Sequence, residues 1–515
     1  MNYKLVIEFI VLALYLVMML FIGLGFYKKN EDMSDYFLGG RSLNKWVAAM
    51  SAQASDMSGW LLLGLPGTAF VLFGGTTSAM WTAIGLLIGT YLNWLFVAKR
   101  LRKQTQVSND SITLPVYFEN RFRDKTKILR IASSLFIMVF FLVYTASQFA
   151  AGAKLFEAAF GVRYHIGLLI GGIIIIGYTF LGGFKAVAWT DLIQGIIMFC
   201  VIVVMPFLLI SKLGGWDQTL IQFQGVEAVK GEVFSWLPRG TAGAVDVLLL
   251  ISSIGWGLGY FGQPHILTRF MAIRSSKEIQ PARIIATVWV ILTLACAVVI
   301  GMLGCLYVNA GLAGPELASL VDGDKEKIFM VLIQSIFGNS SNIIGIILCG
   351  IFLTAILAAI MSTADSQLLV TASSITEDFY CSVAKKTPSQ KKMVWLSRGA
   401  VSVVSLIAML LAMKPESSVF DLVSMAWGGF GAAFGPCIIF SLYWRRMTAQ
   451  GAIAGVLTGG IVDIIWYFMK GGIFEVYELV PAFLISCAVI VVVSLCTKLP
   501  DEVAKQYDEA QAAEI

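Results

Sequence analysis

The sequence predicts an all-α polytopic membrane protein, on the strength of its composition, its apolar runs and two interrupted segments. Charged residues make up only 13% of the 515 positions, whereas hydrophobic residues make up 58%. A soluble chain carries about 25% charged residues. Apolar runs of about 20 residues, the length that crosses a bilayer as a helix, recur along almost the whole chain. We therefore expect about 13 transmembrane helices.

The expected spans follow one another closely. They lie near residues 5–26, 43–73, 76–98, 126–152, 163–182, 186–211, 243–267, 284–309, 340–367, 394–413, 418–443, 449–469 and 477–496. The first run has the length of a full span and lacks a small-residue cleavage site, so it predicts a membrane helix and no cleaved signal.

The charges in the loops predict an orientation. An odd number of spans puts the two termini on opposite sides of the membrane. Loops on the side of the C-terminus hold 27 of the 37 lysines and arginines. Cytoplasmic loops carry the excess of positive charge. We expect a multi-pass protein of the cell membrane with its N-terminus outside and its C-terminus in the cytoplasm.

The second and seventh spans are interrupted. The first interruption runs over 51–60 and continues with Gly64, Pro66 and Gly67, and the second runs over 255–264. Backbone groups freed in this way survive at membrane depth only where they are buried in protein or line a water-filled path. A pair of interrupted segments, one in each half of the chain, is the best sequence indication of a transporter's binding site. These segments predict a secondary transporter.

The positions of the two interruptions predict a repeat. Spans 2–6 and 7–11 form two equivalent sets of five, and an odd-numbered repeat inserts its second copy upside down. The predicted units are 1–42 (first helix and cytoplasmic loop), 43–211 and 243–443 (the two five-helix repeats), 444–500 (two peripheral helices) and 501–515 (a frayed helical cytoplasmic tail).

Several classes of function have little support in the sequence. It contains no Walker loop and no dinucleotide fingerprint, so ATP-driven pumping lacks its usual parts. Two histidines leave little material for an enzyme site or a metal centre other than sodium. We expect no enzyme, no cofactor and no nucleic-acid partner. A channel and a membrane sensor remain as rival classes, and the sensor usually needs a cytoplasmic domain larger than this tail.

Several motifs resemble the sodium–solute symporter family. They are Ser55–Trp60, Gly255–Ile266, Ala358–Thr363 and the loop Tyr36–Ser42, in the family's order, within a similarity that runs from about residue 5 to 500. The resemblance implies a LeuT-like fold with five-plus-five inverted repeats. It also implies sodium-coupled import of L-proline by alternating access. The alternative is a symporter of the same fold for another small solute, such as a sugar, pantothenate or a different amino acid.

By the same resemblance, sodium is the coupling ion and is bound between spans two and nine. Carbonyls of Ala54, Met57 and Ala359 and hydroxyls of Ser362 and Thr363 would coordinate it. Alternatively, the two hydroxyls bond back to their own helical turn. Asp56, flanked by Ser55 and Ser58, would raise sodium affinity without necessarily touching the ion, or would cap the second half-helix.

A second ion site is possible by resemblance between spans six and nine, at Asp191, Asp365 and Ser366. Some family members hold a second sodium between these helices, with hydroxyls where Asp365 and Ser366 stand. The carboxylate of Asp365 would strengthen that site or replace it with a proton-linked group. Alternatively, both aspartates lie at cytoplasmic helix ends, where water solvates them.

Proline presents a carboxylate, a secondary ammonium and a small apolar ring. Amides at a helix break suit the carboxylate, and aromatic faces suit both the cation and the ring. The residues that stand where family members line their pocket are Trp60, Gly64, Tyr144, Trp256, Tyr260, Gln263, Pro264 and Gly350. For a single aromatic residue, packing in the core or in an interfacial belt is the competing explanation.

Overall fold

The computed structural model describes residues 3–27, 33–71, 75–181, 183–230, 235–238, 246–338, 341–384, 389–414 and 418–513, and these fold as helices and connecting turns. Ten helices in this part of the chain are long and apolar enough to cross a membrane. Three shorter apolar helices, Trp60–Phe70, Tyr164–Gly177 and Val247–Gly262, occupy the other expected spans. The all-α polytopic class is therefore confirmed, with a helix in each of the thirteen expected spans.

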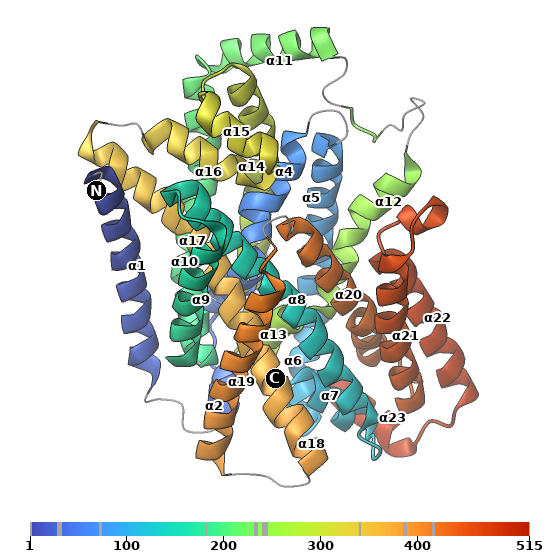
Figure 1. The fold of residues 1–515 in the computed structure, drawn as a ribbon. Helices are drawn as coiled ribbons and strands as arrows, with labels where there is room; N and C mark the ends of the chain where they lie inside the picture. Colours follow the sequence, from blue (N-terminus) through green and yellow to red (C-terminus); the bar gives the residue numbers. More distant parts are fainter. Residues whose placement is uncertain are drawn as a thin grey trace.

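Long helices form a single bundle (Figure 1). The uninterrupted ones are α1 (Tyr3–Tyr27), α5 (Gly75–Leu92), α8 (Ile128–Phe160), α9 (Tyr164–Leu181), α10 (Phe184–Lys212), α14 (Ile279–Asn309), α17 (Ile343–Ser373), α19 (Gln390–Leu411), α20 (Val419–Tyr443), α21 (Ala449–Phe468) and α22 (Leu479–Cys496).

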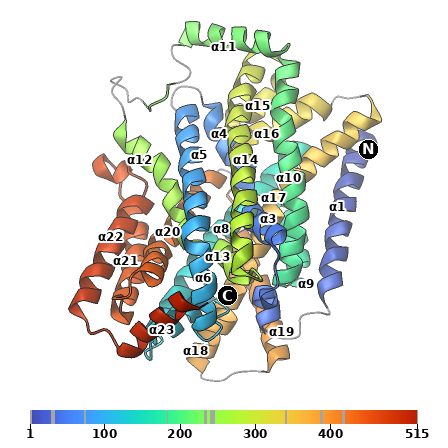
Figure 2. The same cartoon turned by 180° about the vertical axis from the view of Figure 1, so that it is seen from behind.

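Shorter helices lie at the two ends of the bundle or extend the long ones. They are α2 (Met33–Leu38), η1 (Gly39–Arg41), η3 (Asn93–Val97), α6 (Ala98–Val107), α7 (Leu114–Phe122), α11 (Trp216–Lys230), η5 (Ser276–Glu278), α15 (Pro315–Gly323), η6 (Lys325–Lys327), α16 (Ile328–Ile333), η7 (Gln334–Gly338), η8 (Ser374–Tyr380), α18 (Cys381–Ala384), η9 (Gly472–Glu475) and α23 (Asp501–Ala512). Helices α11 and α15 mark one end of the bundle, and α2, α18 and α23 mark the other (Figures 1 and 2).

The first interrupted span consists of α3 (Lys45–Asp56), a π-helical turn η2 (Trp60–Gly64) and α4 (Leu65–Phe70). The side chain of Asn44 caps α3 by accepting the amides of Trp46 and Val47 at 3.0 and 3.1 Å. The helix ends at Asp56 because Met57, with ψ of 75°, leaves the helical region. The chain therefore turns at residues 57–59 before the second half-helix begins.

The second interrupted span consists of α12 (Val247–Gly255), a 3-10 turn η4 (Trp256–Gly262) and α13 (Pro264–Ala272). Pro264 is the first residue of α13, and Gln263 before it is extended, with ψ of 108°. A short stretch of parallel backbone pairing joins the two interrupted spans at one end. The amide of Leu43 donates to the carbonyl of Ala272 at 3.1 Å, and the amide of Arg274 donates to the carbonyl of Leu43 at 2.9 Å.

The C-terminal helix α23 packs against α6 and α7 at the end of the bundle that also holds α2 (Figure 2). Arg123 pairs with Glu502 at 2.7 Å and Arg445 pairs with Asp508 at 2.8 Å. The buried guanidinium of Arg121 donates to the carbonyl of Val503 at 3.1 Å. These contacts attach the helix expected in the tail to the turns that follow α7 and α20 and to α7 itself, so residues 501–512 are packed and not frayed.

Candidate functional site

The point where α3 ends lies against α17, and oxygen atoms meet there. The hydroxyl of Ser362 donates to the carbonyl of Ala54 at 2.8 Å, and the hydroxyl of Thr363 approaches the same carbonyl at 3.4 Å. Ser362 also lies 3.2 Å from the carbonyl of Ala359 in its own helix. The hydroxyl of Ser362 thus contacts both a carbonyl of its own helical turn and a carbonyl of the neighbouring helix. All four residues are fully buried, so their oxygens are shielded from water.

Met57, the fifth residue of the predicted sodium set, terminates α3 one turn after Gln53. Its amide donates to the carbonyl of Gln53 at 2.8 Å. Both residues are fully buried. The side-chain amide of Gln53 makes no hydrogen bond to any residue that the structure describes. The turn therefore contains buried polar groups that the protein itself leaves available.

Asp56 links the two interrupted spans. One of its carboxylate oxygens accepts the hydroxyl of Tyr260, from η4, at 2.5 Å. Its carbonyl accepts the indole N–H of Trp60 at 3.0 Å and the hydroxyl of Tyr144 at 3.5 Å. The amide of Trp60 donates to the hydroxyl of Ser58 at 3.3 Å. The capping role considered for Asp56 therefore belongs to Ser58, and the carboxylate is bonded to Tyr260.

Gln148 on α8 is a site residue that the sequence reasoning missed. Its Nε2 donates to the hydroxyl of Ser58 at 3.2 Å, and its Oε1 accepts the amide of Gly59 at 3.3 Å. The available signal was spacing, since Gln148 follows Tyr144 by four residues and shares its helix face. Ser55, by contrast, donates to the carbonyl of Ala52 in its own turn at 3.2 Å.

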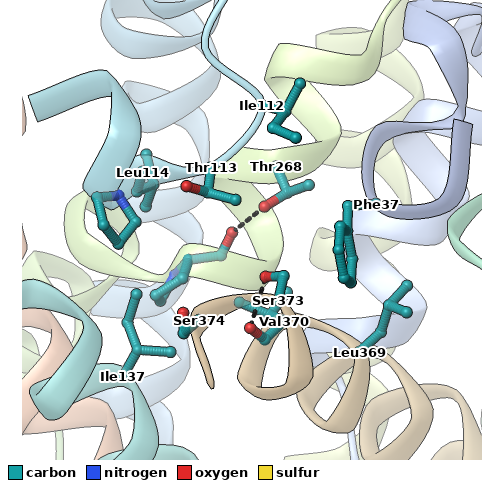
Figure 3. Close-up of a pocket in the computed structure, with 12 residues that line it drawn as sticks. Phe37, Ile112, Thr113, Leu114, Ile137, Thr268, Leu369, Val370, Ser373 and Ser374 are labelled. Carbon is teal, nitrogen blue, oxygen red and sulfur yellow. Dashed lines mark hydrogen bonds between the residues drawn. The ribbon is translucent and has the colours of Figure 1, made fainter. Parts of the chain in front are cut away.

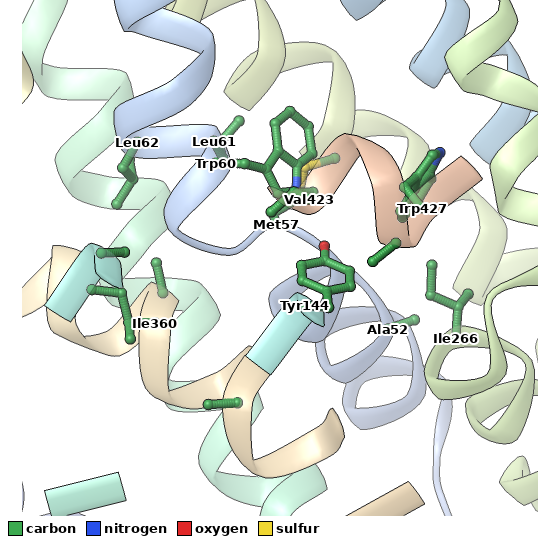
Figure 4. Packing of buried hydrophobic residues seen from close by; sticks show 14 of the residues in the cluster. Ala52, Met57, Trp60, Leu61, Leu62, Tyr144, Ile266, Ile360, Val423 and Trp427 are labelled. Atoms are coloured by element: carbon green, nitrogen blue, oxygen red, sulfur yellow. The ribbon is translucent and has the colours of Figure 1, made fainter. Parts of the chain in front are cut away.

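Aromatic rings close the space beside the two breaks. The ring of Trp256 lies 6.5 Å from Trp60, 4.9 Å from Phe420 and 5.2 Å from Tyr477. The indole of Trp427 donates to the carbonyl of Trp256 at 2.9 Å. Figure 4 shows Trp60 beside Met57 at the break, with Trp427 on α20 to the right and Tyr144 below them. Neither Phe420 nor Tyr477 was predicted, because aromatic residues at helix ends are ordinary in membrane proteins.

The other predicted substrate residues have mixed positions. Gln263 donates to the carbonyls of Gly259 and Trp427, both at 3.1 Å, and so joins η4 to α20. A Cβ on Gly64 would lie 3.0 Å from the ring of Phe420. A Cβ on Gly350 would lie 2.9 Å from Val11 of α1, on the side of α17 that faces away from the rings. The structure therefore brings Gly64 and Gln263 to the breaks but leaves Gly350 outside.

Pro264 lines a small cavity toward the end of the bundle that holds α2 and α7 (Figure 3). The cavity has a volume of ≈ 10 Å³, room for about one water. Its lining comes from five parts of the chain and comprises Phe37, Ile112, Thr113, Leu114, Pro115, Ile137, Pro264, Thr268, Leu369, Val370, Ser373 and Ser374. Pro264 therefore lines a cavity too small for proline.

The residues predicted as a second ion site surround an arginine. The carboxylate of Asp191 accepts the hydroxyl of Ser51 at 2.6 Å and the guanidinium of Arg269 at 3.1 Å. Arg269 also donates to the hydroxyl of Ser366 at 2.5 Å. Asp191 and Asp365 are both fully buried, so the alternative in which water solvates them is wrong. A cation of the protein itself neutralises Asp191. The sequence reasoning missed it, because Arg269 lies just beyond the expected span 243–267 and counts there as a basic residue of the following loop.

At the other end of the bundle, a second buried ion pair holds the start of α20. Lys154 of α8 lies 2.8 Å from Asp324 and 2.5 Å from Glu326. Glu326 also accepts the amides of Val419 and Phe420 at 2.9 and 2.8 Å. A carboxylate at a helix N-terminus satisfies free amides and is favoured by the helix dipole. This contact fixes Phe420 beside Trp256.

A family model decides which family this site belongs to. The model of the sodium:solute symporter family matches residues 36–459. The chain belongs to this family. The sodium/proline symporter of Escherichia coli (strain K12) is 44% identical over 506 residues, which cover 97% of this chain and 95% of that protein. In Bacillus subtilis (strain 168), the high-affinity proline transporter PutP is 44% identical, covering 96% and 99%, and the osmoregulated proline transporter OpuE is 42% identical, covering 96% of each.

Solved structures of other transporters share the fold of this chain. A Na⁺-coupled sialic acid symporter, in a substrate-bound outward-open state, superposes with a TM-score of 0.75 at 21% identity, covering 96% of this chain and 98% of that one. A transporter of the nucleobase-cation-symport-1 family superposes with a TM-score of 0.54 at 13% identity, covering 92% and 98%. At these identities the likeness concerns the fold. The symporter therefore has the expected LeuT-like fold.

Proposed function

We propose that this symporter imports L-proline together with sodium by alternating access. The observation that carries the proposal is the junction of α3 and α17, where a free helix-end carbonyl and two hydroxyls meet beside a ring-lined break. Membership of a sodium:solute symporter family and relatives named for proline support the ion and the solute. Another small solute has no comparable support.

Sodium would bind where Ala54, Ala359, Ser362 and Thr363 converge, with Met57 at the edge. Carbonyl and hydroxyl oxygens suit a hard cation, and a broken helix supplies them without a strongly binding cage. Sodium would take the place of the direct bond between Ser362 and Ala54. Asp56, at the end of α3, would raise the affinity for sodium through its charge and through its hydrogen bond to Tyr260.

Proline would lie beside the break, among Trp60, Tyr144, Trp256 and Tyr260. Gln148, Gln263 and Gly64 complete this proposed pocket, whereas Gly350 lies outside it. The aromatic faces suit the ring and the ammonium. The carboxylate would displace the present acceptors of the Gly59 and Trp60 amides, which are Gln148 and the hydroxyl of Ser58. Since the sodium residues and the pocket share the turn at 57–59, ordering of this turn by sodium would raise the affinity for proline. Such coupling is reciprocal, and a tenfold effect corresponds to about 1.4 kcal/mol.

One sodium site is enough for this mechanism. Arg269 supplies the positive charge at Asp191 and Ser366, so we do not assign a second sodium to these residues or to Asp365. The contact instead ties α13 to α3, α10 and α17, and its release would open the end that holds α2. We expect a sodium-to-proline flux ratio of one.

The proposed cycle also depends on topology. We propose that the N-terminus lies outside and the C-terminus in the cytoplasm, and that 43–211 and 243–443 are the two inverted repeats. Segments 1–42 and 444–500 would be peripheral, and 501–515 a cytoplasmic helix. Opening at the end with Lys154 and Glu326 would admit sodium and proline from outside, and opening near Arg269 would release them inside.

The deciding experiment is uptake of labelled proline into proteoliposomes that contain only this protein. An inward sodium gradient is compared with an equal potassium gradient, with and without a negative-inside potential. We expect concentrative uptake that needs sodium and is enhanced by the potential, since one charge through 100 mV contributes about 2.3 kcal/mol. Sodium-dependent binding without proline uptake would contradict the solute, and uptake without any ion dependence would contradict the coupling.

A further inference from the structure

Two carboxyl groups lie outside the two predicted repeats, where α21 and α22 meet α20. Asp463 of α21 is fully buried, and Glu478, directly before α22, is 8% exposed. Both oxygens of Asp463 and the Oε1 of Glu478 make no hydrogen bond to the residues that the structure describes. A bare buried carboxylate is costly, so such groups are neutralised by a partner or by a bound ion.

Gly428 of α20 shows that the two groups face the same space. A Cβ at this glycine would lie 2.9 Å from the Oδ1 of Asp463 and 3.5 Å from the Cγ of Glu478. It would also lie 3.3 Å from the hydroxyl oxygen of Tyr477. That hydroxyl donates to the carbonyl of Ser424 at 2.7 Å, so its proton is already used. The hydroxyl of Tyr477 is therefore not available as a donor to either carboxyl group.

The charges around the pair do not remove the need for a proton. Glu478 is the charged neighbour that acts on Asp463. Two charged residues lie near Glu478. Lys470, in the connection between α21 and α22, favours its ionised form, and Asp421 of α20 disfavours it. Tyr467 of α21 lies within the field of Glu478 and Asp421. Lys470 is exposed and reaches Glu478 from outside, so Asp463 has no countercharge in the described part of the chain.

We propose that Asp463 and Glu478 form a proton-binding site that holds one proton, on the fully buried Asp463. Two ionised carboxylates in one buried space repel each other, and a proton on Asp463 removes one of the two charges. Sodium suits the site less well, since it needs several oxygens around it and the Tyr477 hydroxyl is directed at Ser424.

This site touches the aromatic rings that cover the proposed pocket, and this part of the inference rests on the proposed function. Tyr477, next to Glu478, stacks on Trp256, and its amide donates to the hydroxyl of Ser252 in α12 at 2.9 Å. Loss of the proton on Asp463 would push Glu478 outward and take Tyr477 with it. The closed arrangement therefore holds one proton more than the opened one. It is favoured at low pH and weakened as the pH rises.

Infrared spectroscopy tests the proton itself, independently of any transport. The purified wild-type protein at neutral pH should show the carbonyl stretch of an un-ionised carboxylic acid, and Asp463→Asn should lose that band. Identical spectra would overturn the proposal. Asp421→Asn, which alters an exposed carboxyl group of α20, is the matched control and should retain the band.

Proline binding at saturating sodium tests the link to the pocket. As the pH is raised above neutral, wild-type affinity should fall by up to about tenfold per pH unit, as expected for one linked proton. Asp463→Asn and Glu478→Gln should bind with little pH dependence, and Asp421→Asn should keep the wild-type slope. Two independent variants guard against misfolding of one. If proline affinity in both variants falls with pH as steeply as in the wild type, the link to the pocket is overturned. The link is also overturned if the variants change the sodium stoichiometry but keep the wild-type pH profile.

Discussion

The two helix breaks lie side by side but are built differently. The first is polar, since the carbonyls of Ala54 and Asp56 accept hydrogen bonds from other helices or from side chains across the turn. The second is tightly packed, since a Cβ on Gly257, Gly259 or Gly262 would overlap α5, the Trp427 indole or the backbone of α20. Tyr260 and Asp56 join the two breaks through a short hydrogen bond.

This difference shows that an interrupted membrane helix can serve two purposes. The first break leaves oxygens available at membrane depth, as ion binding requires. The second lets backbones approach closely, as small residues do at helix interfaces in membranes. If this distinction holds, side-chain changes at the first break should alter ion and substrate binding, and glycine changes at the second should alter stability.

The largest effect on binding is expected from Asp56→Ala. The change removes the acceptor of the Tyr260 hydroxyl and the buried charge of the first break. Hydrogen bonds to charged groups are worth about 1.5–3 kcal/mol, so the sodium concentration for half-maximal uptake should rise about 10- to 100-fold. Tyr260→Phe, which removes the hydroxyl and keeps the ring, should also raise it, but less. If Asp56→Ala keeps the sodium dependence of the wild type, the proposed functional difference between the two breaks is contradicted.

Gly259→Ala should destabilise the fold. The new methyl group would overlap the indole nitrogen of Trp427, which donates to the carbonyl of Trp256. Overpacking of this kind costs about 1–3 kcal/mol, so the midpoint of thermal unfolding in detergent should fall clearly. Gly152→Ala, where no atom lies within 4 Å of the new Cβ, is the matched control and should unfold as the wild type does. Equal midpoints for the two variants would contradict the packing role.

Ser362→Ala should raise the sodium concentration for half-maximal uptake by about two- to tenfold, as expected for one ordinary hydrogen bond. Thr363→Ala should have a smaller effect, because its hydroxyl lies farther from the Ala54 carbonyl. Thr371→Ala is the control, since that hydroxyl on the same helix bonds to its own turn at Gln367. A response of all three variants alike would move the ion site away from the first break.

Gly350→Ala should have the smallest effect on transport. Its new methyl group would meet Val11 of α1 and not the rings around the break. The proline concentration for half-maximal uptake should stay within about twofold of the wild type. Gly64→Ala provides the contrast, since its methyl group would press on the ring of Phe420 and should weaken proline binding. Weaker proline binding in Gly350→Ala would return this glycine to the pocket.

The sequence was sufficient for the class of protein, the spans and the two breaks. Hydropathy reports how each segment meets lipid, and this property is local. Glycine and proline in apolar runs report broken helices for the same reason. Ala54 and Ser362 were named from the resemblance to the family, and Asp56 from its place at the break, where an ionisable residue at membrane depth is unusual.

The sequence was not sufficient for partners. Gln148, Arg269 and Glu326 each acquire a role only when another helix lies against them, and their own segments carry no signal for that neighbour. Gly350 shows the converse case. It lies on α17, the helix that borders the first break, but its Cβ position meets Val11 of α1 instead of the aromatic rings, and the sequence does not reveal this neighbour.

By itself, then, the sequence determined a polytopic helical symporter with its breaks in spans two and seven, since the bilayer constrains each span separately. The tertiary structure alone decided that Tyr260 bonds Asp56, that Arg269 neutralises Asp191, and that Asp463 and Glu478 share one buried space. Hydrogen bonds and charge pairs act over a few ångströms, and the first two of these pairs, 204 and 78 positions apart in the chain, meet at that distance only after the helices have packed.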